Sequence, residues 1–142
     1  MEQLNLHLPE GIRILNIIPI SVSLPSLMAS INAAEYQIEI GRNNLSDEQI
    51  KKMLDESHIP VLRRVKRKEK RIDIRPYIES ITPKDEMLTI HTNFIEGRTA
   101  RIGEILSTLF LSHPLDSRSF PVHRKSQMIK TNGTVHTPMD IR

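Results

Sequence analysis

The strongest chemical signal in this sequence is a run of positive charge near its middle. Eight lysine and arginine residues fall between positions 63 and 75, against the two acids Glu69 and Asp73. The segment therefore carries a net charge of +6 in a chain whose formal net charge is +3. Cations at this density neutralise phosphate groups, so the run indicates binding of RNA or another polyanion. The basic residues are Arg63, Arg64, Lys66, Arg67, Lys68, Lys70, Arg71 and Arg75.

An extended backbone would distribute these cations over two faces of the run. The cations at positions 64, 66, 68 and 70 would share one face, and those at 63, 67 and 71 would line the other. Charge on both faces predicts an arm that projects into water. Two interpretations stay open: a phosphate-binding hairpin, or a solvated arm whose charges discourage edge pairing. No aromatic residue is interleaved, so the stacking pattern of RNA-binding sheets is absent.

Signatures of other chemistries are missing from the sequence. The six histidines are scattered, without the spacing of a zinc site. No nucleophile elbow, dinucleotide-binding glycine motif or P-loop occurs. The chain has no cysteine, which excludes disulfides, thiolate metal sites and iron–sulfur ligation by its own residues. We therefore expect no catalytic site, and an independent enzyme is the least favoured function class.

A smaller feature is the pair Arg98 and Arg101, which precedes an amphipathic segment. Cations at the start of a helix oppose the helix dipole. A bound anion would offset this, because the free backbone N–H groups of a helix start attract anions. The alternative is that both arginines simply face solvent.

The elements that must position these residues alternate between strands and helices. Periodicity predicts a helix that ends at Pro9, a helical turn over 26–31, a helix from Ser46 that ends before Pro60, and a helix capped by Thr99. Gln49 completes a capping box with Ser46. Strands are expected over 12–20, 34–40, 60–67, 71–75, 78–81, 87–92, 120–130 and 135–137. A charged turn at 68–70 and a tight turn at Asn132–Gly133 join neighbouring strands.

This succession predicts a single α+β domain over residues 1–142. Strand–helix–strand units near 34–67 and 87–130 indicate a ferredoxin-like βαββαβ order, with an extra basic hairpin near 68–81. Two helices would cover one face of an antiparallel sheet. The N-terminus lacks the features of a signal peptide, and no apolar run is long enough to span a bilayer. We expect a cytoplasmic protein without a membrane partner.

Several stretches, taken together in order, resemble one known family. They are Leu8–Leu15 (LPEGIRIL), Pro25–Met28 with Ala33–Tyr36, Ile72–Ile78 (IDIRPYI), and Arg124 with Lys130–Gly133 and Thr137–Met139. These stretches resemble the radical-SAM-linked domain of unknown function. That family is found adjacent to, or fused with, an uncharacterised radical-SAM protein of the B12-binding type. By this resemblance the chain corresponds to the C-terminal two-thirds of the family domain, without its N-terminal third.

The resemblance implies a non-catalytic accessory domain that docks a radical-SAM enzyme and presents its substrate. S-adenosylmethionine and the iron–sulfur cluster would belong to the partner, and this chain would hold no cofactor. The alternative is an RNA-binding module that acts through the basic arm Arg63–Arg71, in keeping with the RNA-processing genes found beside the family. The oligomeric state is left open.

The polar positions that match the family are Asp73, Arg75, Arg101 and Arg124. Their arginines are expected to help form a surface for an anionic ligand. An equally open interpretation is that Asp73, Arg75 and their neighbours form a structural ion-pair network.

Overall fold

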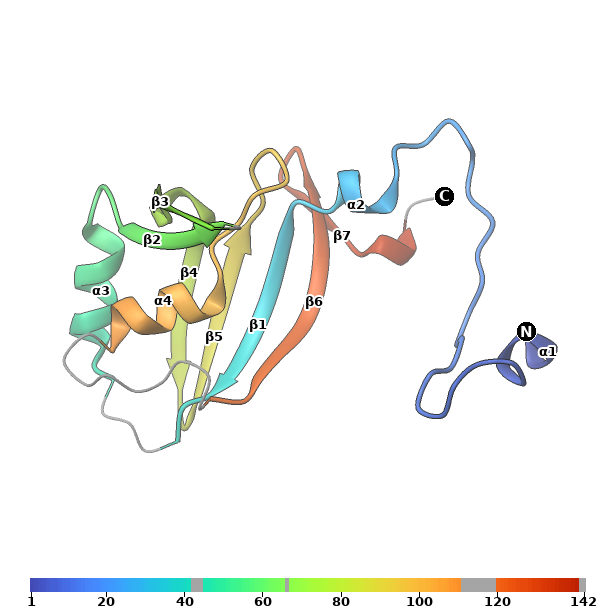
Figure 1. Ribbon diagram of the computed structural model, residues 1–142, viewed down its shortest axis with the longest axis horizontal. Coiled ribbons are helices and arrows are strands. Elements are labelled where there is room, and N and C mark those ends of the chain that lie inside the picture. Colours follow the sequence, from blue (N-terminus) through green and yellow to red (C-terminus); the bar gives the residue numbers. More distant parts are fainter. Residues whose placement is uncertain (42–44, 66, 111–119, 141–142) are drawn as a thin grey trace.

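The computed structural model describes residues 1–41, 45–65, 67–110 and 120–140, and its fold class is α+β, as predicted. Five strands form an antiparallel sheet in the order β4-β5-β1-β6-β7 (Figure 1). Their bounds are β1 (Ala33–Glu39), β4 (Ile78–Lys84), β5 (Met87–Asn93), β6 (Val122–Thr131) and β7 (Thr134–His136). Asn132 and Gly133 both have positive φ, of 50° and 79°, which confirms the predicted tight turn between β6 and β7.

Two longer helices, α3 (Asp47–Asp55) and α4 (Ile102–Leu109), pack on one face of this sheet. The capping box of α3 is confirmed, since the Gln49 N–H donates to Ser46 Oγ at 3.2 Å and the Ser46 N–H donates to Gln49 Oε1 at 2.9 Å. The predicted cap of α4 was wrong, because the N-cap is Arg101 and not Thr99. The first helical carbonyl is that of Arg101, which accepts from the Ile105 N–H at 3.2 Å, and the Glu104 carboxylate accepts from the Arg101 N–H at 2.9 Å. The Thr99 carbonyl accepts a hydrogen bond from Arg63 instead.

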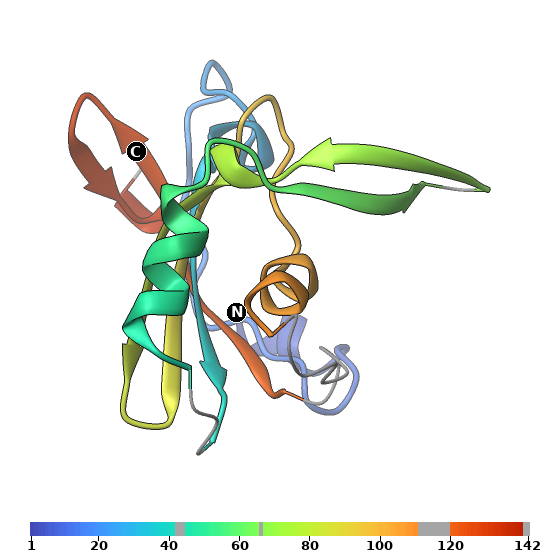
Figure 2. The same cartoon turned by 90° about the vertical axis from the view of Figure 1, so that its left-hand side faces the viewer.

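Strands β2 (Pro60–Val65) and β3 (Lys68–Asp73) form a separate hairpin that projects away from the body (Figure 2). The predicted turn at 68–70 was wrong, because the chain reverses between Val65 and Lys68 and the following residues are strand. The physical reason is the register, which places Val61 opposite Ile72 so that both apolar side chains pack against the core. The expected strand over 71–75 correspondingly ends at Asp73, and Arg75 begins the 3₁₀ turn η1 (Arg75–Tyr77).

The hairpin therefore follows α3 instead of lying near 68–81. The predicted strand–helix–strand unit over 34–67 was wrong, because β2 pairs with β3 in a separate two-stranded sheet and β4 is the strand that follows α3 in the main sheet. The succession of the main sheet and its helices is β1-α3-β4-β5-α4-β6. The ferredoxin-like classification itself stays a prediction.

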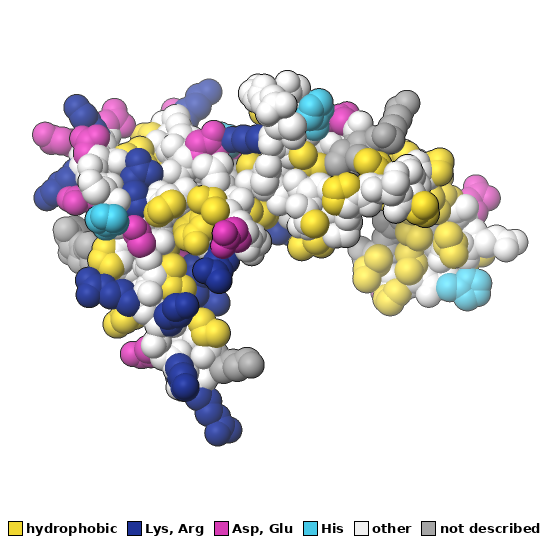
Figure 3. Space-filling model, turned by 90° about the horizontal axis from the view of Figure 1, so that it is seen from above, with side chains coloured by type: hydrophobic (Ala, Val, Ile, Leu, Met, Phe, Trp, Pro, Cys, Tyr) yellow, Lys and Arg dark blue, Asp and Glu magenta, His cyan; other side chains and the backbone are white. Residues whose placement is uncertain are grey.

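The N-terminal segment extends away from the sheet, beyond the side on which β6 and β7 lie (Figures 1 and 3). It contains α1 (Glu2–Asn5) and α2 (Leu27–Ser30), and the 3₁₀ turn η3 (Pro138–Asp140) lies at the other end of the chain. The predicted strand over 12–20 was wrong, since these residues have no strand partner among the described residues. Asn5 instead exchanges two hydrogen bonds with the Ile14 backbone, at 2.7 and 3.0 Å, which ties the segment to α1.

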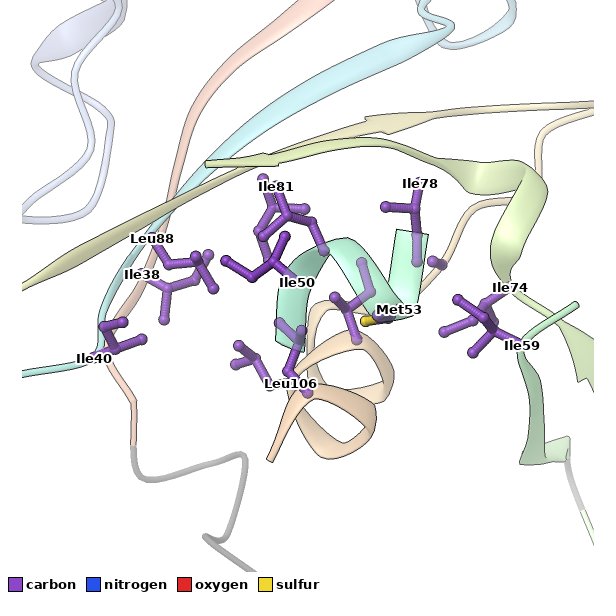
Figure 4. Close-up of a cluster of buried hydrophobic side chains, with 14 residues drawn as sticks. Ile38, Ile40, Ile50, Met53, Ile59, Ile74, Ile78, Ile81, Leu88 and Leu106 are labelled. Atoms are coloured by element: carbon purple, nitrogen blue, oxygen red, sulfur yellow. The ribbon is translucent and has the colours of Figure 1, made fainter. Parts of the chain in front are cut away.

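The core lies between the sheet and the two helices (Figure 4). Ile38 on β1, Leu88 and Ile90 on β5, and Ile105 and Leu106 on α4 are almost completely buried. The predicted amphipathic stripe of α4 is confirmed by the burial of Ile105, Leu106 and Leu109.

Within the described part of the chain, no helix has the length and apolarity needed to cross a membrane.

Candidate functional site

The β2–β3 hairpin carries the densest positive charge of the described residues. Its exposed cations stand out from the molecule on the projecting arm, which is dark blue in Figure 3. One acid, Glu69, lies opposite Arg64 in the ladder. The exposed cations are Arg64, Arg67, Lys68, Lys70 and Arg71. Lys66, which the sequence also indicated, lies outside the described residues.

The cross-strand register divides these cations differently from the extended-chain prediction. Arg63 lies opposite Lys70, and Val65 lies opposite Lys68, so these residues share the face that packs on the core at its root. Leu62 lies opposite Arg71 and Arg64 opposite Glu69, on the other face. The predicted face shared by positions 64, 68 and 70 was wrong, because Arg64 pairs with Glu69 and therefore lies on the side opposite to Lys68 and Lys70. The predicted face of positions 63 and 71 was wrong for the same reason, since Arg63 pairs with Lys70 and Arg71 with Leu62. Position 66 lies outside the described residues.

Arg63 anchors the hairpin to α4 and is not part of its exposed charge. Its Nε donates to Glu104 Oε1 at 2.7 Å, and one terminal nitrogen donates to Glu104 Oε2 at 2.5 Å and to the Thr99 carbonyl at 3.0 Å. Only 12% of the Arg63 side chain and 13% of the Glu104 side chain are exposed. This bidentate pair is the strongest type of ion-pair geometry available to a protein.

The electrostatics of this pair follow from its geometry. The hydrogen bond to Glu104 raises the pKa of the Arg63 guanidinium above its ordinary value, against the opposing effect of burial. Burial raises the pKa of the Glu104 carboxyl, but the hydrogen bonds from Arg63 and from the Arg101 N–H outweigh burial, and the pKa lies below its ordinary value. Both groups are therefore charged at neutral pH.

Asp73 and Arg75 lie at the root of the hairpin, where β3 ends. Asp73 Oδ1 accepts hydrogen bonds from the Ile59 and Arg75 N–H groups at 2.8 and 3.0 Å, and Oδ2 lies 2.8 Å from His58 Nδ1. Burial raises the pKa of Asp73, but these hydrogen bonds reverse the shift, so the pKa lies below its ordinary value.

The Arg75 side chain is directed at backbone. It donates to the Leu54 carbonyl at 3.0 Å and to the Ile78 carbonyl at 2.9 Å, which links α3 to β4. These two contacts account for a partly buried arginine, and they place Arg75 apart from the exposed cations of the hairpin.

The two remaining predicted arginines lie elsewhere. Arg101 is exposed at the N-terminus of α4, close to the root of the hairpin, where its backbone N–H donates to Glu104 at 2.9 Å. Arg124 is exposed on β6, opposite Tyr36 of β1. The structure therefore brings together the cations of the hairpin and places Arg101 beside its root. Arg124, on β6, lies apart from them.

A groove opens between α3, α4 and β2, at the root of the hairpin. Its volume is about 640 Å³. Its apolar lining includes the buried residues Met53, Ile59 and Leu109, and its rim includes His58, Ser107 and Thr108. The sequence pattern does not indicate this groove, because its three walls are separated along the chain and meet only in the folded structure.

The sheet face opposite the helices carries a polar row that the sequence analysis also missed. His91 Nδ1 lies 3.1 Å from Ser80 Oγ, and His91 Nε2 lies 3.9 Å from Glu35 Oε2. Ser126 Oγ donates to the same Glu35 oxygen at 3.5 Å. The cross-strand register brings these four side chains together from β1, β4, β5 and β6.

The open sheet face carries carboxylates, and its Lys130 is paired with Glu79. Glu35 and Glu39 of β1 both point to it, and alternation along the described strands places no aromatic side chain there. Carboxylates repel phosphates, and sheet surfaces that bind RNA rely on aromatic stacking. Among the described residues, no group of three histidines or acids is arranged to hold a metal ion.

The N-terminal segment presents exposed apolar side chains. Leu15 is 81% exposed, Ile17 is 56% exposed, and the Val22 side chain is fully exposed. Contiguous apolar surface of this kind is typical of a site that contacts another protein.

Together these features define an α+β domain with a projecting basic hairpin and an apolar groove at the root of that hairpin. The chain belongs to the family DUF2344, described as an uncharacterized protein conserved in bacteria, whose model matches residues 1–104. No curated protein and no solved structure matches the chain significantly.

Proposed function

We propose that this chain is a binding domain that holds RNA through its β2–β3 hairpin. The observation that supports the proposal is the set of five exposed cations on an arm that projects from the body. Arg63 and Arg75 are engaged inside the protein, so the binding surface consists of the outer cations alone. The open sheet face is disfavoured by its carboxylates, which leaves the hairpin as the surface with suitable charge.

Such an arm would contact phosphates and not base edges. Lysine and arginine side chains on a two-stranded ribbon can follow the backbone of a nucleic acid, and binding of this kind is sequence-tolerant and weakens with salt. Because cations lie on both faces of the ribbon, a flexible single strand can contact either side.

The test is a titration of a fluorescent single-stranded RNA at low and at moderate salt. The variant is Arg64→Ala/Arg71→Ala, and the matched control is Lys51→Ala/Lys84→Ala, which removes two exposed cations from α3 and β4. We expect the hairpin variant to reduce the slope of log affinity against log salt by about 1.4, because each lost phosphate contact on a single strand contributes about 0.7. Equal slopes for the two variants, or no binding by the natural sequence, would overturn the proposal.

We further propose that the domain docks a radical-SAM enzyme, which would carry S-adenosylmethionine and the iron–sulfur cluster. The support is the resemblance of the Leu8–Leu15 and Ile72–Ile78 stretches to radical-SAM-linked proteins, together with the exposed apolar N-terminal segment. The hairpin would then hold an RNA for the partner.

Docking is tested by size-exclusion chromatography of the chain mixed with a radical-SAM protein of the B12-binding type. Leu15→Asp should abolish the complex, whereas Val135→Asp, at another exposed apolar position on β7, should leave it intact. Absence of a complex at micromolar concentration would contradict this second proposal.

A further inference from the structure

His58 stands at the rim of the groove in a fixed orientation. Its side chain is 81% exposed, yet Nδ1 is held 2.8 Å from the Asp73 carboxylate. Asp73 is itself held by two backbone N–H groups. An exposed ring that is already oriented loses little entropy when a ligand binds, and because Asp73 engages Nδ1, the other ring nitrogen is the one that a ligand can reach.

The groove and the hairpin are continuous. Pro60, Val61 and Leu62 of β2 form one wall of the groove, and the same strand runs directly into Arg63 and Arg64. A polyanion that lies along the hairpin would therefore pass the mouth of the groove. Leu62, which is 71% exposed, lies at this junction.

The chemistry of the groove suits one nucleotide unit of a single strand. Its floor of Met53, Ile59 and Leu109 offers apolar contact to the flat face of a base. Its rim offers the exposed hydroxyl group of Ser107 to a base edge, whereas the Thr108 hydroxyl already donates to the Glu104 carbonyl at 2.9 Å. The volume of about 640 Å³ falls within the range of small-ligand sites.

The charges around the groove agree with this occupant. Lys52 and His58 on the rim can contact a phosphate. Of the acids that line it, Glu104 is neutralised by Arg63, and the Glu56 carboxylate can accept a hydrogen bond from the amino group of a base. A base in a duplex cannot enter such a groove, because its edge and faces are already paired and stacked.

We infer that the groove at the root of the hairpin receives an unpaired base of single-stranded RNA, with His58 as a positioned contact at its rim. The inference rests on the proposed RNA binding by the hairpin and adds a preference for single strands. The hairpin supplies phosphate contacts, and the groove supplies the selection between single-stranded and duplex RNA.

The test compares a short single-stranded oligoribonucleotide with its duplex, each titrated against the full chain. Ser107→Tyr fills the groove from an exposed position of α4, and Ser107→Ala is the matched control that keeps the groove open. We expect Ser107→Tyr to weaken single-stranded binding about tenfold, somewhat less than the loss of a full aromatic stacking contact, and to leave duplex binding unchanged, because a filled groove can no longer receive a base. His58→Ala, which changes an exposed side chain, should reduce the same preference.

The outcomes separate the inference from the proposed function. If neither Ser107→Tyr nor His58→Ala changes the preference while Arg64→Ala/Arg71→Ala still lowers the salt slope, the groove inference is wrong and the hairpin proposal stands. If Ser107→Tyr instead abolishes only the complex with the radical-SAM protein, the groove binds protein and the inference is overturned. If the natural sequence binds neither RNA, both fail.

Discussion

Replacement of Arg63 by alanine should destabilise the whole domain, although Arg63 belongs to a run of otherwise exposed cations. The side chain forms two hydrogen bonds to Glu104 and one to the Thr99 carbonyl, and it joins the hairpin to α4. In Arg63→Ala, the Glu104 carboxylate would remain mostly buried with only the Arg101 N–H among its present donors. An unpaired buried charge is among the few causes of large destabilisation.

The expected magnitude is about 3 kcal/mol. Breaking one partner of a buried ion pair costs roughly 3–5 kcal/mol, and the lower end applies because Glu104 keeps some access to water. A loss of this size should lower the melting temperature by roughly 10 °C in a domain of this length. Arg64→Ala is the control, since Arg64 is exposed and its loss should change the free energy of unfolding by less than about 0.5 kcal/mol.

The assay is urea unfolding followed by circular dichroism, applied to Arg63→Ala, Glu104→Ala and the double variant. We expect the double variant to be only slightly less stable than either single variant, because removal of the second charge relieves the first penalty. If Arg63→Ala and Arg64→Ala are equally stable, or if the two single effects simply add, the assignment of Arg63 as a structural anchor is refuted.

Three further predictions concern stability. The pKa of Glu104 is lowered in the folded protein, so this group contributes stability that is complete above the ordinary glutamate pKa of about 4.3 and is lost as the pH falls through the lowered pKa. The free energy of unfolding should therefore fall more steeply below about pH 4 in the natural sequence than in Glu104→Gln. Measurement of the urea midpoint as a function of pH checks this. Arg75→Ala should lower the free energy of unfolding by about 2–3 kcal/mol, because one carbonyl of α3 and one of β4 lose a charged hydrogen-bond donor. Arg98→Ala is the exposed control and should leave the stability unchanged, and thermal melting of the two variants compares them. Ser46→Ala should cost about 1 kcal/mol through the lost capping box of α3, and equal melting of the variant and the natural sequence would contradict that role.

Local signals in the sequence predicted the elements whose stability depends on nearby residues. Ser46 and Gln49 specified the start of α3 because both capping hydrogen bonds form within one turn. Asn132 and Gly133 specified the β6–β7 turn because both residues tolerate positive φ. The apolar spacing of α4 predicted its buried face, since Ile105, Leu106 and Leu109 lie on one side of any helix.

Elements that depend on distant partners were predicted less well. Residues 12–20 have the composition of a strand, but strand formation requires a neighbouring edge, and Asn5 holds the Ile14 backbone instead. Thr99 is a suitable helix cap by type, but its carbonyl is engaged by Arg63 from the hairpin. In both cases the structure shows a contact with a residue outside the local segment that the local sequence pattern does not indicate.

The sequence by itself determined the α+β class, the presence of most helices and strands, and the concentration of positive charge between residues 63 and 75, because these follow from composition and short-range periodicity. Only the tertiary structure decided which of those charges face solvent. Arg63 and Arg64 are adjacent and chemically identical, yet the strand directs one to Glu104 of α4 and the other away from the core. The groove beside them was likewise decided by packing, because it exists only where α3, α4 and β2 meet.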